Sequence, residues 1–313
     1  MNSSKAALQV DLAKSRGGLD QSRLVVAWLM LLPLLLGLLI FAIYPSIYVL
    51  GLSFTKSTLG QPFKAYLGLR NYHWLAFGGD DIFVPSLLRA AIFSICVSLV
   101  ELGLGLWLAV LLASMQRLSR LVRSILLLPL MTPPVLVGTA WKLLLAPGGG
   151  LVNGKLLSLG IVDAPISFLG TQPWALLSLM VADAWQWTPF VAILAYAALR
   201  QVPDDVVEAA LLDGANATAI FWKIQLPMTA PLLLAIFMLR LIMAFKTFDL
   251  LYILTFGGPG ASTDMAGFAV WRTALRNFDV GTAAAETVLF AAFVSLALLP
   301  LLWLHRRVER IAS

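Results

Sequence analysis

Glu208-Ala209-Ala210-Leu211-Leu212-Asp213-Gly214-Ala215 belongs to a polar interruption between two strongly apolar segments. The interruption continues to Ile224-Gln225-Leu226-Pro227, and nine residues separate Gly214 from Ile224. Pro203 ends the preceding segment. Asp205, followed three residues later by Glu208, makes a capping-box pattern that predicts the start of a helix. Gly214 is expected to end that helix, because glycine adopts a left-handed turn at little steric cost.

A second short helix is expected over residues 217–224. Pro227 is then expected to open the next apolar segment, where its missing N–H does no harm in a first helical turn. The sequence therefore predicts a helix–Gly–helix element over residues 203–227, set between two membrane spans.

The composition excludes a soluble globular domain. Hydrophobic residues make up 60% of the chain and charged residues 12%, and the mean hydropathy is +0.89. The net charge of +6 comes from basic residues that are scattered beside apolar runs, which favours membrane topology over a nucleic-acid surface. Cys96 is the single cysteine, and His73 and His305 are far apart, so no metal site is expected.

The apolar runs predict an all-α membrane protein. Residues 1–23 read as a cytoplasmic tail, residues 24–304 as a six-span membrane domain, and residues 305–313 as a second cytoplasmic tail. Each run is long enough to cross a hydrocarbon core of about 30 Å. The expected transmembrane helices cover residues 24–52, 87–113, 121–145, 174–199, 228–254 and 283–304.

The distribution of lysine and arginine predicts the orientation. The two tails, the linker after the second span and the 203–227 element together carry about twice as many basic residues as the other connections. Short cytoplasmic loops are the ones enriched in lysine and arginine. Both termini and the 203–227 element are therefore expected in the cytoplasm.

The 203–227 element resembles the coupling motif of ABC-importer permeases, in which Glu-Ala-Ala and Gly are followed, after nine residues, by Ile-x-Leu-Pro. Phe221 and Pro231 match the sugar-importer version, as do Asp213 and Ala215. The resemblance implies that the element contacts a separate ATPase. The residues that it assigns to this contact are Glu208, Ala209, Ala210, Asp213, Gly214, Ala215, Ile224, Leu226 and Pro227.

Three further segments are similar to sugar-importer permeases of the maltose, glycerol-phosphate and trehalose type: residues 68–72, residues 183–190 and residues 248–259. The resemblance implies a bacterial-type inner-membrane subunit that pairs with a second permease, a cytoplasmic ATPase dimer and an external solute-binding protein. ATP and magnesium would be bound by that ATPase, and this chain would have neither a cofactor nor a catalytic residue. The implied cargo is an oligosaccharide or a related polyol.

Ionisable residues at membrane depth indicate that something polar crosses here, because each costs at least about 2.5–3.5 kcal/mol unless it faces a partner or a cavity. Lys246 and Asp249 lie three residues apart on the expected fifth span and could simply neutralise each other. The full set is Glu101, Asp183, Arg240, Lys246, Asp249 and Glu286.

On the fifth span, four positions recur at helical spacing, and the resemblance implies that this stripe and three fourth-span positions face the bound sugar. Aromatic faces, amides, hydroxyls and guanidinium groups suit a carbohydrate. A plain helix–helix interface is the alternative reading of the same residues. The candidates are Gln186, Trp187 and Phe190 with Arg240, Met243, Ala244 and Thr247.

Two other classes compete with the importer. An ion-coupled secondary transporter would also have buried charges, but such transporters usually carry internal repeats, which this sequence lacks. An intramembrane enzyme would need a catalytic constellation, and the sequence contains none of the usual motifs. Gly149, Gly154 and Lys155 have the spacing of a phosphate-binding loop, but Leu156 stands where that loop needs serine or threonine.

Overall fold

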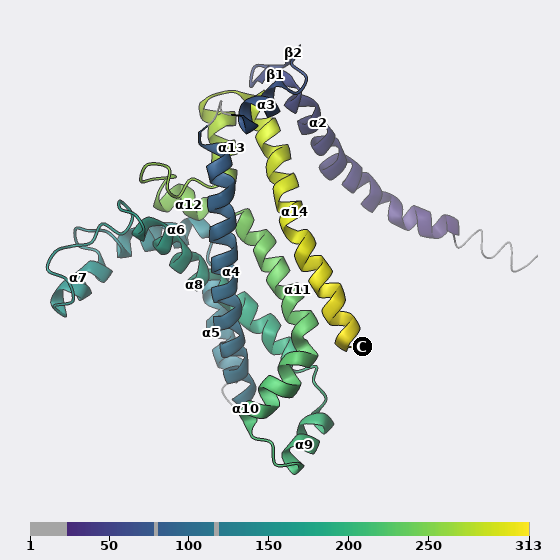
Figure 1. The fold of residues 1–313 in the computed structure, drawn as a ribbon, viewed down its shortest axis with the longest axis vertical. Coiled ribbons are helices and arrows are strands. Elements are labelled where there is room, and N and C mark those ends of the chain that lie inside the picture. Colours follow the sequence, from purple (N-terminus) through teal and green to yellow (C-terminus); the bar gives the residue numbers. More distant parts are fainter. Residues whose placement is uncertain (1–23, 78–80, 116–118, 313) are drawn as a thin grey trace, which may run out of the picture.

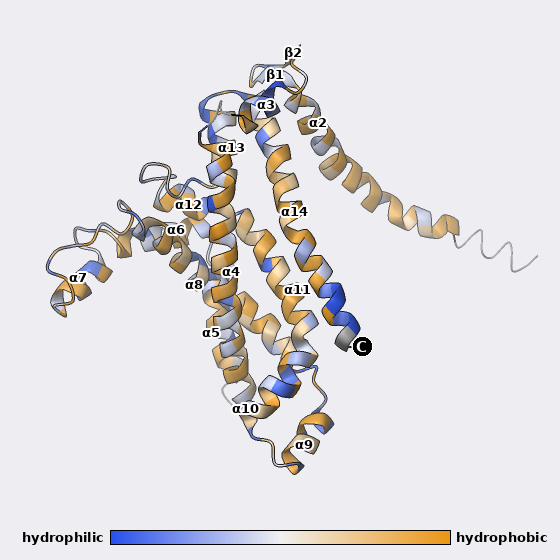
Figure 2. Ribbon diagram, in the orientation of Figure 1, coloured by the Kyte–Doolittle hydropathy of each residue, from blue (hydrophilic) through white to orange (hydrophobic). Residues whose placement is uncertain are grey.

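The computed structural model describes residues 24–77, 81–115 and 119–312; the expected N-terminal tail lies outside them. The described chain is mostly helical, with one small two-stranded sheet, which confirms the predicted class of a helical membrane protein (Figure 1). Hydrophobic residues predominate along the long helices, while the C-terminal end of α14 is hydrophilic (Figure 2). Among the described residues, five helices are long and apolar enough to cross a membrane: Leu24–Ser53, Phe83–Ser114, Trp174–Leu199, Ala217–Phe245 and Val280–Arg310.

The first of these helices stands apart from the bundle. It contains the π-helical turn η1 (Leu39–Ile43) and the α-helix α2 (Tyr44–Ser53). Its most apolar stretch has no buried residue, and it leans away from α14 (Val280–Ala312) except near their shared end (Figure 1). A helix that exposes apolar residues all round is expected to be covered by lipid or by a partner.

A small cap follows the first helix. Strand β1 (Thr55–Thr58) pairs antiparallel with β2 (Gln61–Tyr66), and the short helix α3 (Arg70–Ala76) comes next. The Asn71 side-chain amide donates hydrogen bonds to the carbonyl oxygens of Ser53 (2.9 Å) and Thr55 (3.1 Å). The Tyr72 hydroxyl lies 2.6 Å from the Ser53 hydroxyl. The Asn-Tyr pair thus ties the cap to the end of the first helix.

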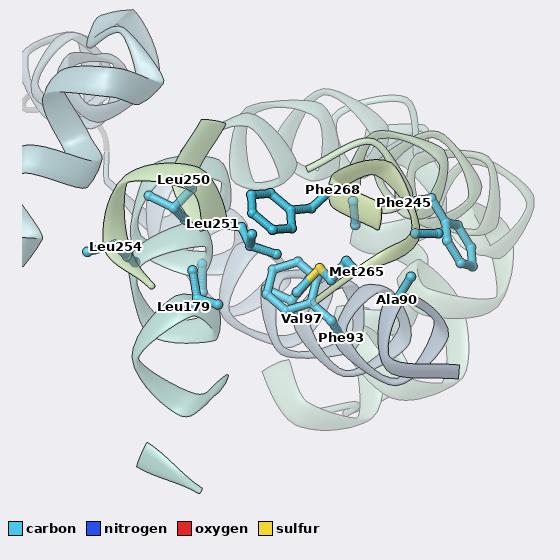
Figure 3. Close-up of a cluster of buried hydrophobic side chains, with 14 of the residues drawn as sticks. Ala90, Phe93, Val97, Leu179, Phe245, Leu250, Leu251, Leu254, Met265 and Phe268 are labelled. Atoms are coloured by element: carbon cyan, nitrogen blue, oxygen red, sulfur yellow. The ribbon is translucent and has the colours of Figure 1, made fainter. Parts of the chain in front are cut away.

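The centre of the bundle is built by α4 (Phe83–Ser114), α8 (Trp174–Leu199) and α11 (Leu226–Phe245). Gly105 lets α4 approach α8 closely, because a Cβ atom at that position would lie 2.7 Å from the side chain of Val191. The main apolar core joins these helices to α12 (Asp249–Leu254) and α13 (Ala266–Trp271). Figure 3 shows Phe93 and Val97 of α4 meeting Met265 and Phe268 in this core.

The third span is not the continuous helix predicted over residues 121–145. It consists of α5 (Ser119–Met131) and α6 (Pro134–Leu144), which meet at a bend of 90°. Pro133 and Pro134 explain the break, since proline removes backbone N–H groups and disfavours helix at the residue before it. The pair counts as a sixth span only if the bent helices are taken together. The helix α7 (Leu151–Ser158) follows.

The fifth span also differs from the prediction at both ends. Ala217 begins a helix that runs without interruption through α10 (Ala217–Ile220), the π-helical η2 (Phe221–Gln225) and α11 to Phe245. Pro227 therefore lies inside a longer helix and does not open one. The helix stops at Phe245 instead of continuing to Leu254, and α12 is a separate helix. After α13 and the π-helical η3 (Arg272–Arg276), α14 closes the described chain.

Candidate functional site

The predicted helix–Gly–helix element forms one end of the molecule. Helix α9 (Asp204–Leu212) projects at the tip beside α10, at the end opposite β1 and β2 (Figure 1). Pro203 is its N-cap residue, and no side chain caps the helix, so the expected capping box between Asp205 and Glu208 does not form. Two acidic residues in the first turn, Asp204 and Asp205, instead complement the positive end of the helix.

Gly214 sets the turn between α9 and α10. Its φ angle is +81°, a left-handed conformation that glycine adopts without strain. The Ala215 N–H donates to the Ala210 carbonyl at 2.9 Å, and the Gly214 N–H donates to the Leu211 carbonyl at 3.0 Å. This pair of bonds is the Schellman motif, which satisfies carbonyls at the end of α9. The next helix begins at once, because the Asn216 side chain accepts from the Ala219 N–H at 2.8 Å.

The tip exposes apolar side chains to its surroundings. No residue of α9 is buried, and the exposed fractions of Leu211, Leu212 and Trp222 are 56%, 90% and 61%. An apolar surface on a segment rimmed by polar residues is typical of a protein–protein interface. Of the predicted coupling residues, Glu208, Ala209, Asp213, Gly214 and Pro227 are exposed, while Ala210, Ala215, Ile224 and Leu226 are partly exposed.

A buried charge cluster lies deep in the bundle, where α4, α8 and α11 meet. Arg240 is 1% exposed and forms ion pairs with Glu101, which is 0% exposed, and Asp183, which is 2% exposed. One guanidinium N–H donates to Glu101 Oε1 at 2.8 Å. The ring of Trp187 covers the guanidinium, with 5.3 Å between the guanidinium carbon and the ring centroid. We name this set of four residues the Arg240 cluster.

The fourth-span candidates differ in exposure: one is buried and two are partly exposed. The Gln186 side chain is buried and donates to the Thr132 carbonyl at 3.0 Å, so it satisfies a backbone group freed by the break between α5 and α6. Trp187 and Phe190 are partly exposed, and their rings meet edge to face with centroids 6.0 Å apart. These two rings lie next to the Arg240 cluster and are partly open to a molecule outside the helix.

The fifth-span candidates do not form one exposed stripe. Met243 is partly exposed, whereas Arg240 and Ala244 point into the core. Thr247 lies beyond the end of α11, and its side chain lies against the carboxylate of Asp183. Substrate contact by these residues stays a prediction, and the packing role that competes with it is now visible for Ala244.

The structure places the other ionisable residues differently from the sequence. Lys246 and Asp249 are not on one helix, both are exposed, and no ion pair joins them among the contacts of the described chain. Glu286 is buried and accepts a hydrogen bond from the Thr273 hydroxyl at 2.9 Å. The pairing of Glu101 and Asp183 with Arg240 was missed. The only signal for it was the presence of each charge within an apolar run.

A separate groove of about 580 Å³ opens between α4, α5 and α8. Cys96 and Thr188 are its only polar lining side chains apart from the indole N–H of Trp185, and leucine, valine, alanine, methionine and proline supply the rest. A carbohydrate would lose its hydrogen bonds to water there without replacement. The groove is therefore unsuited to the predicted cargo.

Long apolar helices, a buried ion cluster and an exposed helical tip define the chain as a multi-pass membrane transport subunit. The chain belongs to the family of binding-protein-dependent transport system inner membrane components, whose model matches residues 101–310. It is 34% identical, over 259 residues, to the trehalose/maltose transport system permease protein MalF of Thermococcus litoralis, covering 82% of this chain and 86% of the relative. It is 27% identical, over 271 residues, to the sn-glycerol-3-phosphate transport system permease protein UgpA of Agrobacterium fabrum, covering 86% of this chain and 91% of that one.

The fold is shared with a solved bacterial alginate ABC transporter in complex with an alginate pentasaccharide-bound periplasmic protein. The TM-score is 0.79 at 22% sequence identity, over 94% of this chain and 97% of the other. A methionine ABC transporter matches more loosely, with a TM-score of 0.53 at 19% identity, over 74% of this chain and 96% of the other. Both likenesses bear on the fold alone. The predicted permease class is confirmed.

Proposed function

We propose that this chain is one of two permease subunits of an ATP-driven importer that moves an oligosaccharide or related polyol from an external binding protein into the cytoplasm. A separate ATPase dimer, which binds ATP and magnesium, docks on the 203–227 element. Both termini and this element lie in the cytoplasm of a bacterial-type cell. The sugar-permease relative and the charge distribution support this assignment.

The exposed tip is the observation that carries the proposal. Leu212 is 90% exposed at the end of α9, beside a glycine turn of fixed geometry. A helix end with such a side chain is incomplete without a partner, and a partner that closes and opens could move it. Glu208 adds an exposed carboxylate that can pair with a basic residue of the ATPase.

The carbohydrate assignment is supported by the partly exposed rings of Trp187 and Phe190 together with Met243. Aromatic faces can lie against the apolar face of a sugar ring. Family membership favours an ATP-driven importer over the ion-coupled alternative, because the relatives in this family depend on a binding protein.

The test is substrate-stimulated ATP hydrolysis by the complete complex in proteoliposomes, with Leu212→Asp as the decisive variant. We expect Leu212→Asp to reduce co-purification of the ATPase and to abolish coupled uptake, because it places a charge in an apolar contact. Leu159→Asp is the matched control, since Leu159 is 70% exposed at the end of α7, far from the tip. Normal ATPase association of Leu212→Asp would place the contact elsewhere, and uptake without ATP would favour the ion-coupled alternative.

A further inference from the structure

The Arg240 cluster has an unusual charge balance. Arg240 is the only buried basic residue in the part of the chain that the structure describes, and it faces two buried carboxylates. With both carboxylates ionised, the cluster carries one net negative charge. With one proton held between them, it is neutral. Neither state leaves an uncompensated positive charge.

The guanidinium is also occupied by its neighbours. Its Nε and Nη2 atoms are engaged by Glu101 and Asp183, and the Trp187 ring lies over it. Thr247 lies against Asp183 on the side beyond the end of α11. Arg240 therefore has the wrong surroundings for a residue that receives an anion, because two buried carboxylates already balance or exceed its positive charge.

The cluster lies directly behind the surface proposed to meet the cargo. Trp187 belongs to both: the guanidinium lies over its ring, and its partly exposed ring pairs with Phe190. Lys246 and Asp249, beyond the end of α11, are exposed and opposite in sign, so they add no net charge nearby. A negatively charged cargo would leave its hydration shell to meet a surface that is neutral or negative.

From this geometry we propose that the Arg240 cluster makes this half of the pathway selective for uncharged carbohydrates and excludes uronic acids and sugar phosphates. The inference rests on the proposed function. Membership of the family does not decide the question, since relatives are named for an uncharged disaccharide and for glycerol phosphate alike. Arg240 then acts as a positioning residue that holds Trp187, and Glu101 and Asp183 determine the charge that the pathway presents.

The test compares methyl α-glucoside with methyl α-glucuronide, which differ only in a hydroxymethyl group and a carboxylate. The complex of the two permeases and the ATPase dimer is used without the binding protein. In it this chain carries Met243→Cys and Cys96→Ser, and the partner subunits lack cysteine. The rate at which maleimide labels the new cysteine is measured over a range of concentrations of each sugar, at matched ionic strength. We expect the glucoside to slow labelling at a concentration at least about tenfold lower than the glucuronide, as an unfavourable charge at short range requires.

A double variant, Glu101→Gln with Asp183→Asn, keeps the shape of the cluster and leaves Arg240 uncompensated. We expect it to reverse the preference, so that the glucuronide protects better than the glucoside. Equal protection by both sugars in the wild-type complex would overturn the charge inference and leave the proposed function standing. Continued exclusion of the glucuronide by an assembled double variant would also overturn it.

Protection by neither sugar in the wild type would instead remove the proposed pathway, and the inference with it. Uptake assays on the complex with its binding protein added back separate these outcomes, because they report the proposed function independently of charge. Where the double variant does not assemble, the wild-type comparison decides the inference by itself.

Discussion

Replacing Gly214 by valine should uncouple the tip from the membrane helices without disturbing the membrane helices themselves. The φ angle of Gly214 is +81°, and a Cβ atom built there meets nothing within 4 Å. The cost is therefore purely conformational, with no contribution from a clash. A β-branched residue in the left-handed region costs about 1–3 kcal/mol. Such a cost reduces the population of the native turn by about 5- to 150-fold.

The assay measures ATPase co-purification and substrate-stimulated ATP hydrolysis for a graded series at this position. Asparagine tolerates the left-handed region better than other non-glycine residues, so Gly214→Asn should retain most activity, Gly214→Ala less and Gly214→Val least. Gly154→Val is the matched control. Gly154 lies on α7, has an ordinary φ angle and likewise has nothing within 4 Å of a built Cβ atom.

The reasoning fails if Gly214→Val couples ATP hydrolysis to substrate as well as the wild type does. It also fails if the series follows side-chain size without regard to left-handed preference, so that asparagine is worse than alanine. Membrane insertion, followed by protease protection of the apolar helices, should be the same for every member of the series.

Three other predictions follow, two from single contacts and one from the expected orientation. Gly105→Ala should lower the thermal stability of the complex by about 1–3 kcal/mol, because its Cβ would lie 2.7 Å from a valine of α8, whereas Gly103→Ala, with open space around it, should not. Asn216→Ala should lose about 1 kcal/mol of local stability at the start of α10, measured by hydrogen exchange of the first turn. Cysteine placed at Lys155 should be labelled from outside intact cells and cysteine at Leu212 only after permeabilisation; the opposite pattern would contradict the orientation.

Much of the fold follows from apolar length alone. The predicted bounds of the fourth span are those that the structure gives, and the predicted end of the first span differs from the observed end by one residue. Both follow because a long apolar run in a membrane leaves the backbone no alternative to a helix. The break after Met131 was missed although Pro133 and Pro134 signalled it. Prolines within other helices, such as Pro189 and Pro300, are tolerated, so a proline by itself does not decide between a kink and a break.

The candidate site was harder to predict than the fold. Gly214 could be placed from its own chemistry, since a left-handed turn is a local property. The pairing of Arg240 with Glu101 joins residues 139 positions apart, and no local pattern specifies such a contact. Gln186 was assigned to the substrate by resemblance alone, and its hydrogen bond to the Thr132 carbonyl could not be foreseen because the break between α5 and α6 had not been predicted.

The helix that leaves the tip has a mechanical consequence. It runs unbroken for 29 residues from Ala217 to Phe245, a length of about 44 Å. The chain changes direction between α10 and α11 (Figure 1). Arg240 lies 14 residues beyond Leu226, the first residue of α11, or about 21 Å, so a tilt of α11 by about 10° at Leu226 displaces the guanidinium by about 4 Å. A relative displacement of this size would separate the guanidinium from its carboxylates and break the ion pairs. If an ATPase moves the tip as proposed, either α4 and α8 must therefore move as one body with α11 or the Arg240 cluster must open.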